Sequence, residues 1–366
     1  MSILVVGAGL SGAVLANKLS ADSEVVVIDY SEIMAGNCYD YRDNNGIMVH
    51  KYGSHIFHTS DEDVWKYLLQ FTLFNNYTHE VIGMVDGKEI PIPINFKSIQ
   101  RLFPDNAKSI ENKLLSFYGY GARISIMDLM KQDDEELKNI ADYFYENIFL
   151  HYTEKQWGRT PYEIDGSVIA RVPVVIGEDD RYFQDRFQGV PIEGYTKMIE
   201  KMLYSPNITV RLNLSFKDID PSEYDKIFYT GPIDELMDYC YGPLPYRSVR
   251  FELEEYDMEH YQSNAVVNYP NEHEYTRIHE YKYYLNDKSD RTVIAKEYSE
   301  EFILGKNGRF YPIPTVKNIA LYNRYLKLAK ERYPNIYFLG RLGDYKYYDM
   351  DKAIARAFEV YREAMQ

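Results

Sequence analysis

The sequence predicts an α/β protein, more finely α+β, that combines a Rossmann-like βαβ domain with a helical insertion lobe and an antiparallel sheet domain. Three observations predict this fold class. A strand, a glycine turn and a helix open the chain, residues 98–149 have helical periodicity, and later stretches alternate polar and apolar residues. At 366 residues the chain is long enough for two or three domains.

The N-terminal residues have the order of elements that a dinucleotide-binding unit requires. Residues 2–6 form a short apolar strand, Gly7-Ala8-Gly9-Leu10-Ser11-Gly12 follows directly, and residues 13–19 have helical spacing. A second apolar strand over 24–28 ends at Asp29. A glycine turn framed by two strands and an acid is a far more specific signal than the glycines alone.

Each part of this turn has a chemical reason. Gly7 permits the tight turn, Gly9 lets the backbone approach a pyrophosphate, and Gly12 lets the helix pack closely on the sheet. The pyrophosphate is expected at the helix N-terminus, where unpaired N–H groups and the dipole favour negative charge. Asp29 lies 22 residues after Gly7, close to the spacing of an acid that binds a ribose hydroxyl. We therefore predict that the N-terminus binds an adenine dinucleotide.

Composition excludes several classes of partner. The net charge of -15, from 41 Lys and Arg against 56 Asp and Glu, gives no electrostatic footprint for nucleic acid. Two cysteines, Cys38 and Cys240, make neither a disulfide framework nor a metal site and suit a reducing compartment. Because no leader precedes Ile3 and no apolar run reaches membrane-spanning length, we expect a cytoplasmic protein without nucleic-acid or membrane partners. Whether it forms a homodimer stays open.

Three histidines lie close together in the sequence, at His50, His55 and His58. Histidine clusters can bind a metal ion, but no cysteine or carboxylate stands at ligand spacing beside these three. We therefore predict no metal site.

Local patterns predict the elements between these motifs. A helix is expected over 61–71 with Ser60 as its N-cap, and a hairpin over 81–94 with Asp86-Gly87 at its turn. Residues 98–149 are predicted to be helical, whereas residues 152–159 are too irregular for a simple packed helix. Beyond Gly194 the pattern predicts a helix over 195–203, strands over 208–212, 226–230, 248–253, 265–269, 291–297 and 336–341, and a final helix over 350–363.

These elements predict three domains, two of them discontinuous. The dinucleotide-binding domain is expected to comprise residues 1–75, about 195–240 and 330–366. Residues 98–190 are expected to form the helical substrate lobe, and residues 76–97 with 241–329 the antiparallel sheet domain. Residues 158–191 are rich in loops and glycines, so we expect a mobile loop that closes over the substrate.

Blocks of distinctive composition are spread through nearly the whole chain. They are His50-Lys51-Tyr52-Gly53, His55-Ile56-Phe57-His58-Thr59, Tyr152-Thr153-Glu154-Lys155-Gln156-Trp157-Gly158-Arg159, Tyr229-Thr230-Gly231-Pro232-Ile233-Asp234, Tyr246-Arg247-Ser248 and Tyr345-Lys346-Tyr347-Tyr348-Asp349-Met350. Together they resemble the bacterial UDP-galactopyranose mutases, and the third and last blocks are much more specific than the glycine turn. The resemblance implies that the dinucleotide is FAD and that the substrate is a UDP-sugar.

In that family the reduced flavin is the nucleophile: its N5 attacks the anomeric carbon of the sugar, UDP leaves and returns, and no net redox change occurs. The resemblance therefore implies an isomerase (an intramolecular transferase) whose side chains bind and orient instead of attacking. It implies interconversion of UDP-galactopyranose and UDP-galactofuranose, which supplies furanose donors for surface polysaccharide.

The resemblance also implies roles for individual residues. Arg171 and Arg277 match a pair that clamps the diphosphate, a task that guanidinium forks perform well, and His58 matches a residue along the flavin ring. For binding FAD the resemblance implies Gly7, Gly9, Leu10, Ser11, Gly12, Asp29, Asn37, His55, Ile56, Arg341, Asp349 and Met350. For binding the UDP-sugar it implies His79, Tyr152, Trp157, Arg171, Tyr182, Arg247, Asn268, Arg277, Tyr311 and Tyr347.

Some positions depart from the family pattern and leave alternatives open. Ala35-Gly36-Asn37 replaces the usual Gly-Gly-Asn, and Thr78-His79-Glu80 stands where relatives carry an asparagine that faces the sugar. The same chemistry on another nucleotide hexose, UDP-N-acetylgalactosamine or a deoxyhexose, therefore stays open. A flavin oxidoreductase of the amine-oxidase type would share the glycine turn but needs no diphosphate clamp. A nucleotide-sugar binding protein without catalysis would have no use for FAD.

Overall fold

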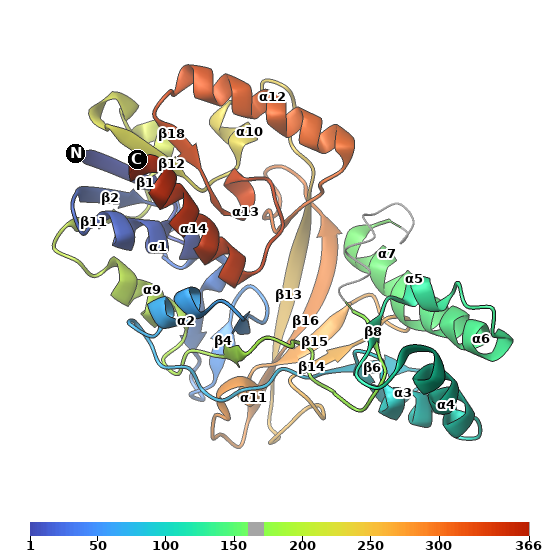
Figure 1. The fold of residues 1–366 in the computed structure, drawn as a ribbon. Coiled ribbons are helices and arrows are strands. Elements are labelled where there is room, and N and C mark those ends of the chain that lie inside the picture. Colours follow the sequence, from blue (N-terminus) through green and yellow to red (C-terminus); the bar gives the residue numbers. More distant parts are fainter. Residues whose placement is uncertain (160–171, 366) are drawn as a thin grey trace.

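The computed structural model describes residues 1–159 and 172–365 and confirms the α/β fold class. A parallel sheet with helices on both faces lies at one end of the molecule, a helical lobe lies at the other, and a long antiparallel sheet extends between them (Figure 1). Among the described residues, no helix is both long enough and apolar enough to cross a membrane.

The parallel sheet is built from segments that lie far apart in the sequence. Its strand order is β11-β2-β1-β12-β18 and every neighbouring pair is parallel. Alternate residues of β1 serve opposite faces, because Ile3 and Val5 are buried with the helices of one face and Leu4 with those of the other. The strands are β1 (Ser2–Val6), β2 (Glu24–Ile28), β11 (Ile208–Arg211), β12 (Lys226–Tyr229) and β18 (Ile336–Phe338).

Helices cover both faces of this sheet. The core of one face contains residues of α1 (Leu10–Leu19), α9 (Tyr195–Leu203) and α14 (Met350–Met365), and that of the other contains residues of α10 (Ile233–Leu236) and α12 (Val316–Arg332). The predicted boundary at residue 330 placed α12 with the antiparallel sheet. Tyr325 and Ala329 are instead buried with Leu4 of the parallel sheet. The apolar stripe of α12 is narrow, which explains why the sequence did not reveal this helix.

The second sheet has seven strands in the order β17-β13-β16-β15-β14-β6-β7. Every neighbouring pair is antiparallel except β14 with β6. The predicted hairpin forms, and positive φ angles of 49° at Asp86 and 69° at Gly87 close its turn. The strands are β6 (Val81–Val85), β7 (Lys88–Ile92), β13 (Tyr246–Tyr256), β14 (Val266–Asn268), β15 (Arg277–Glu280), β16 (Thr292–Glu301) and β17 (Tyr311–Pro312).

The helical lobe packs on the hairpin end of that sheet. Val85 and Ile92 of the hairpin are buried with Ile99, Ile140 and Phe144 of the lobe. The lobe comprises α3 (Phe96–Leu102), α4 (Ala107–Tyr118), α5 (Ile126–Leu129), α6 (Glu135–Phe144), one π-helical segment (Tyr145–Leu150) and α7 (His151–Trp157).

Helix α7 corrects one prediction, because residues 152–159 were expected to be too irregular for a packed helix. The helix is regular up to Trp157, and Gly158 ends it with a φ of 65° and an N–H that donates to the carbonyl of Glu154. Thr153 is the only fully buried side chain of α7 in the described chain. Its sequence therefore lacks the broad apolar stripe by which packed helices are recognised.

Shorter elements connect these layers. The helix predicted over 61–71 is α2 (Glu62–Leu68), and its N-cap is Asp61 and not Ser60: the Asp61 carboxylate accepts from the backbone N–H groups of Asp63 and Val64. Ser60 instead donates to Oδ1 of Asp185 at 2.8 Å. The remaining strands and helices are β3 (Asp40–Arg42), β4 (Met48–His50), β5 (Phe57–Thr59), β8 (Arg123–Ile124), β9 (Val174–Val175), β10 (Phe187–Gly189), α11 (Lys282–Leu285) and α13 (Gly340–Gly343).

The segment 158–191, which was predicted to be mobile, is described in part. Val174–Val175 pairs with β8 and Phe187–Gly189 pairs with β5, so both stretches are held by strand pairing. Residues 160–171, which include Arg171, lie outside the described residues.

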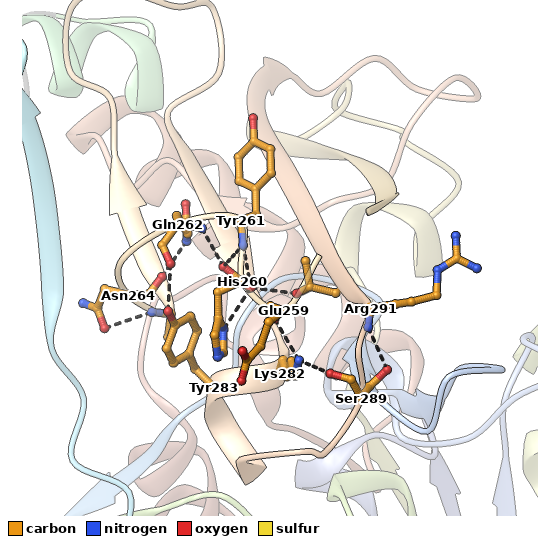
Figure 2. A network of polar contacts seen from close by, with 12 residues as sticks. Glu259, His260, Tyr261, Gln262, Asn264, Lys282, Tyr283, Ser289 and Arg291 are labelled. Atoms are coloured by element: carbon orange, nitrogen blue, oxygen red, sulfur yellow. Dashed lines mark hydrogen bonds and ion pairs between the residues drawn. The ribbon is translucent and has the colours of Figure 1, made fainter. Parts of the chain in front are cut away.

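A buried carboxylate holds the long connection between β13 and β14. Glu280 is fully buried and accepts hydrogen bonds from the backbone of Tyr261 and Gln262 and from the hydroxyl of Thr292. Figure 2 shows the Lys282 ammonium between the carbonyl oxygens of Glu259 and Ser289. Because Glu280 ends β15, these contacts fix the strand that carries Arg277.

Candidate active site

One cavity of about 290 Å³ lies where the antiparallel sheet meets the helical lobe and the C-terminal part of the dinucleotide-binding fold. Its walls come from segments more than 200 residues apart in the sequence, including 52–58, 148–157 and 341–350. The predicted site residues that line it are His55, Ile56, His58, His79, Tyr152, Trp157, Tyr182, Asn268, Arg277, Tyr311, Arg341, Tyr347, Asp349 and Met350.

The glycine turn stands outside this lining, between β1 and α1. A Cβ on Gly7 would lie 2.0 Å from Oγ1 of Thr230, and one on Gly12 would lie 1.9 Å from the carbonyl oxygen of Gly7. The protein's own packing therefore requires both glycines. Gly9 differs, because the nearest heavy atom to its added Cβ is Cα of Gly36 at 3.8 Å. The protein leaves room beside Gly9, as a backbone that receives a pyrophosphate must.

Asp29 follows β2 at the same edge of the sheet and holds the glycine turn in place. Its Oδ2 accepts from the N–H of Ala8 at 2.8 Å, and its Oδ1 accepts from the N–H of Ser31 at 2.9 Å. Burial raises the pKa of this carboxyl, while the two backbone N–H groups lower it. The N–H of Ala35 donates to the carbonyl of Ala8 and so holds the segment 35–37 beside the glycine turn. Asn37 in this segment is exposed.

Arg277 provides a fixed positive charge in the cavity wall. Its Nε lies 2.8 Å from Oε2 of Glu297 and its Nη2 lies 2.8 Å from Oε1, a bidentate pair between β15 and β16. Burial raises the pKa of Glu297, but the charge of Arg277 and the hydrogen bonds from His279 and Arg277 outweigh it and bring the pKa to about 2. The pair uses one edge of the guanidinium, and the Nη1 edge is not part of it.

Aromatic rings form the wall next to this charge. The ring centroid of Tyr311 lies 5.5 Å from that of Tyr347 and 6.3 Å from that of Trp157. The guanidinium of Arg341 lies over the Tyr347 ring at 4.9 Å from its centroid. Burial raises the pKa of Tyr311 to about 12 and also raises that of Tyr152, so both phenols are neutral hydrogen-bond donors at neutral pH.

Three of the predicted histidines, His55, His58 and His79, also line the cavity. Burial lowers the pKa of His55 and of His79 to about 3, so both imidazoles are neutral at pH 7. His58 is held between two partners: its Nδ1 lies 2.7 Å from Oδ2 of Asp185, and its ring stacks on Phe183 at a centroid distance of 3.6 Å.

Asn268 contributes an acceptor to the same cavity. Its Oδ1 is buried and has no hydrogen-bond partner among the described residues. Asn268 pairs with Arg277 in the register of β14 and β15, so the acceptor and the positive charge lie on adjacent strands. A buried acceptor without a partner indicates a place for a donor from a ligand.

Comparison with known proteins assigns the family. A family model described as UDP-galactopyranose mutase matches residues 147–347, which is more than half of the chain. A probable UDP-galactopyranose mutase of Klebsiella pneumoniae is 40% identical over 98% of this chain and 93% of its own length. The chain belongs to the UDP-galactopyranose mutase family. The predicted family is thus confirmed, and because mutases are isomerases, so is the predicted enzyme class.

Other members of the mutase family differ in the sugar that their names print. A dTDP-fucopyranose mutase of Escherichia coli is 35% identical over 98% of this chain and 96% of its own length. A UDP-galactopyranose mutase of Mycoplasma pneumoniae is 34% identical over 99% of this chain and 96% of its own length. Membership of the family therefore establishes a nucleotide-sugar mutase and leaves the sugar and the base to experiment.

Structural comparison agrees with this assignment at the level of the fold. The crystal structure of a reduced UDP-galactopyranose mutase superposes with a TM-score of 0.74 at 17% identity, covering 100% of this chain and 95% of that one. A redesigned putrescine oxidase shares the fold more distantly, with a TM-score of 0.54 at 13% identity, covering 100% of this chain and 98% of that one. A second family model, described as an NAD(P)-binding Rossmann-like domain, matches residues 5–71 and agrees with the predicted dinucleotide-binding N-terminus.

Within this mutase fold, Arg247 lies behind the cavity wall and not in it. Its Nε donates to the carbonyl of Gln156 at 2.9 Å, and its Nη2 donates to the carbonyl of Lys155 at 3.2 Å and to Oγ of Ser299 at 3.0 Å. Arg247 thus holds the C-terminal end of α7, the helix that carries Tyr152 and Trp157 into the cavity.

Several residues of the mutase site were not predicted from the sequence. Glu297 and His279 belong to adjacent strands, and β15 was not predicted, so nothing in the sequence brought them together. Asp185 lies in a connection 127 residues from His58. Of this group, Glu297 alone had a usable signal, a carboxylate at the end of the strand predicted over 291–297.

Proposed function

We propose that the protein is a flavin-dependent mutase that interconverts the pyranose and furanose forms of a UDP-linked hexose, with UDP-galactose as the first candidate. The observation that carries this proposal is the lining of the cavity in a member of this family. A guanidinium fixed by a buried carboxylate and the phenols of Tyr152 and Tyr311 lie next to the C-terminal part of a dinucleotide-binding fold. Such a set of donors suits a diphosphate beside a bound cofactor.

The residues present fit FAD. The close approach that a backbone without a side chain allows at Gly9 suits the pyrophosphate, and Gly7, Leu10, Ser11, Gly12, Asp29 and Asn37 would hold the adenosine diphosphate part. On the cavity side His55, Ile56, Arg341, Asp349 and Met350 would lie along the flavin ring. When bound and reduced, the flavin supplies N5 as the nucleophile for the anomeric carbon. His58 would lie along the ring, with an orientation fixed by Asp185.

The chain's own residues bind and orient the substrate. Arg277 would bind the diphosphate through its free edge and stabilise the charge that develops as UDP leaves; Arg171, outside the described residues, is proposed as its counterpart. His79, Tyr152, Trp157, Tyr182, Asn268, Tyr311 and Tyr347 would contact the base, the phosphates and the sugar, and Arg247 would support this wall from behind.

Two glycine variants test the cofactor against a purely structural role of the turn. Gly9→Ala should fold with the stability of the unmodified apoprotein and lose most of its flavin, because the added Cβ makes only ordinary van der Waals contacts in the protein but would obstruct the pyrophosphate. The matched control Gly12→Ala should unfold at a lower temperature with or without flavin, because its Cβ meets the carbonyl of Gly7. Flavin absorbance and thermal unfolding measure both effects. Normal flavin content in Gly9→Ala would contradict the proposed binding mode.

Turnover tests the reaction itself. The protein reduced with dithionite should convert UDP-galactopyranose to the furanose, detected by chromatography, and the oxidised protein should not. Full activity of the oxidised form would contradict a mechanism that needs the N5 lone pair. Release of hydrogen peroxide from an amine substrate would instead indicate an oxidase.

A second candidate substrate is a dTDP-linked deoxyhexose. A relative of similar identity is a dTDP-fucopyranose mutase, and His79 stands in the cavity wall. Incubating the reduced protein with UDP-galactose, UDP-N-acetylgalactosamine and dTDP-fucose at equal concentrations would rank them by kcat/KM.

We propose that the furanose product serves as a donor for surface polysaccharide.

A further inference from the structure

A chain of polar contacts leads from Arg277 along the cavity wall, because Glu297, His279 and Ser54 also line the cavity. Arg277 pairs with Glu297, and Oε2 of Glu297 also lies 2.7 Å from Nε2 of His279. Nδ1 of His279 lies 2.6 Å from Oγ of Ser54, and Ser54 in turn contacts the hydroxyl of Tyr284. Glu297, His279 and Tyr284 are each at least 97% buried. The contacts among these three side chains and the half-buried Ser54 therefore have few competing partners from bulk solvent.

The negative charge of Glu297 determines which atom is the donor in each hydrogen bond of this chain. The ionised carboxylate of Glu297 can only accept, so Nε2 of His279 carries the proton. Burial lowers the pKa of His279, so the ring is neutral and its Nδ1 accepts. Ser54 has a single hydroxyl proton and donates it to Nδ1, and the Ser54 oxygen therefore accepts from Tyr284.

The geometry makes this chain a support for the arginine. Glu297 is held from two sides, by the guanidinium of Arg277 and by the ring of His279, and the ring is held by Ser54. Without the hydrogen bond from Ser54, the His279 ring loses the contact that fixes its plane, and the carboxylate loses a fixed partner. The orientation of Arg277 depends on that carboxylate, because both bonds of the bidentate pair run to it.

We propose that Ser54 and His279 are positioning residues that hold Glu297, and through it Arg277, in the orientation that receives the diphosphate of the nucleotide sugar. This inference rests on the proposed function, which places the diphosphate at Arg277. Ser54 also precedes His55, another residue of the cavity lining, so the same chain joins the arginine to the segment proposed to lie along the flavin.

A double-mutant cycle on the flavin-loaded full-length protein tests the proposal, with UDP binding measured by titration calorimetry. Ser54→Ala and His279→Gln should each weaken UDP binding roughly three- to tenfold, the range expected for one lost hydrogen bond. In an Arg277→Ala background, Ser54→Ala should have no further effect, because its influence acts through the arginine. The matched control Ser248→Ala should leave UDP affinity unchanged, since Ser248 is a buried serine of the same sheet whose Oγ has no hydrogen-bond partner in the described part of the chain.

Nitrogen-15 NMR of histidine-labelled protein gives a test that needs no ligand. His279, identified by the signal missing in His279→Gln, should show the Nε2–H tautomer, and Ser54→Ala should shift its Nδ1 resonance toward that of an unbonded acceptor. An Nδ1–H tautomer would overturn the proposal. So would equal effects of Ser54→Ala on UDP binding with and without Arg277. Failure of the unmodified protein to bind UDP would contradict the proposed function, and the NMR result would still show whether the chain of contacts exists.

Discussion

Arg277 and Arg247 occupy the same sheet, were both predicted to bind substrate, and have different surroundings. Arg277 is locked by a buried carboxylate on the neighbouring strand and lines the cavity. Arg247 donates to two carbonyl oxygens of α7 and to one serine hydroxyl, and it is outside the cavity lining. The carboxylate of Glu297 fixes Arg277 and leaves one edge of its guanidinium for a ligand. Arg247 instead donates its hydrogen bonds to the carbonyl oxygens of α7 and thereby acts as a brace for that helix. Resemblance located both residues, and only their partners distinguish the two tasks.

Replacing Arg277 should reduce catalysis more than replacing Arg247. A small reduction would contradict the distinction between a ligand-binding Arg277 and a structural Arg247. Arg277→Ala should raise the activation free energy that corresponds to kcat/KM by roughly 3 kcal/mol or more. The substitution removes the diphosphate contact and leaves Glu297 buried without its partner. Arg277→Lys should recover little, because an ammonium cannot reproduce the bidentate fork. Steady-state kinetics on the reduced protein measure both variants. A lysine variant with a near-normal rate would place the diphosphate elsewhere.

Replacing Arg247 should mainly cost stability. Arg247→Ala should lower the free energy of unfolding by about 2 kcal/mol, the scale for losing hydrogen bonds from a buried charged group. Because α7 stays attached through other contacts, kcat/KM should fall by less than about tenfold. Denaturant unfolding and kinetics together separate the two effects. The exposed Arg250 on the same strand is the control, and its alanine variant should change stability by less than about 0.5 kcal/mol. A kinetic loss as large as that of Arg277→Ala would show that Arg247 binds the ligand directly.

The contrast also shows how far local patterns can reach. The glycine turn, the hairpin and the fold class were predicted correctly, because each depends on residues close together in the sequence. Strand β15 was missed: it spans only four residues, Arg277–Glu280, and three of them are polar. Arg277 forms an ion pair with Glu297, neutral His279 forms a hydrogen bond with Glu297, and Glu280 accepts hydrogen bonds from the neighbouring connection. Polar–apolar alternation ends at the adjacent pair His279 and Glu280, and a strand with one apolar residue in four gives little signal in the sequence.

The partners of the site residues could not have been predicted from spacing. Glu297 meets Arg277 only through the register of β15 with β16, and Ser54 meets His279 across 225 residues of sequence. Helix α7 was misjudged for a related reason: its residues looked too irregular for a packed helix, and the carbonyl oxygens at its end are held by Arg247 of strand β13. Tertiary contacts decided each of these cases, while local sequence decided the glycine turn.

Acid should destabilise the protein through its buried histidines, two of which lie in the segment 50–55 that contains Ser54. Burial lowers the pKa of His50 and His55 to about 3, whereas the unfolded chain titrates near 6.5. Below about pH 6.5 the unfolded state therefore binds more protons, and the stability present at pH 7 is lost as the pH falls toward 3. Each histidine should cost of the order of 1–2 kcal/mol between pH 7 and 5. Unfolding curves at both pH values should show a smaller loss for His50→Gln than for the unmodified protein, and an equal loss would contradict this origin.

Ser299→Ala should have the smallest effect and tests how the Arg247 brace is assembled. Ser299 donates to the carbonyl of Gln156 at 2.6 Å and accepts from Nη2 of Arg247 at 3.0 Å, so its hydroxyl closes a ring of three residues. Its removal should cost about 1 kcal/mol of unfolding free energy, because Arg247 still donates to both carbonyl oxygens. The double variant with Arg247→Ala should cost less than the sum of the two single variants, since they share partners. Strict additivity in denaturant unfolding would mean that Ser299 and Arg247 hold α7 independently, and the brace would then be two separate contacts.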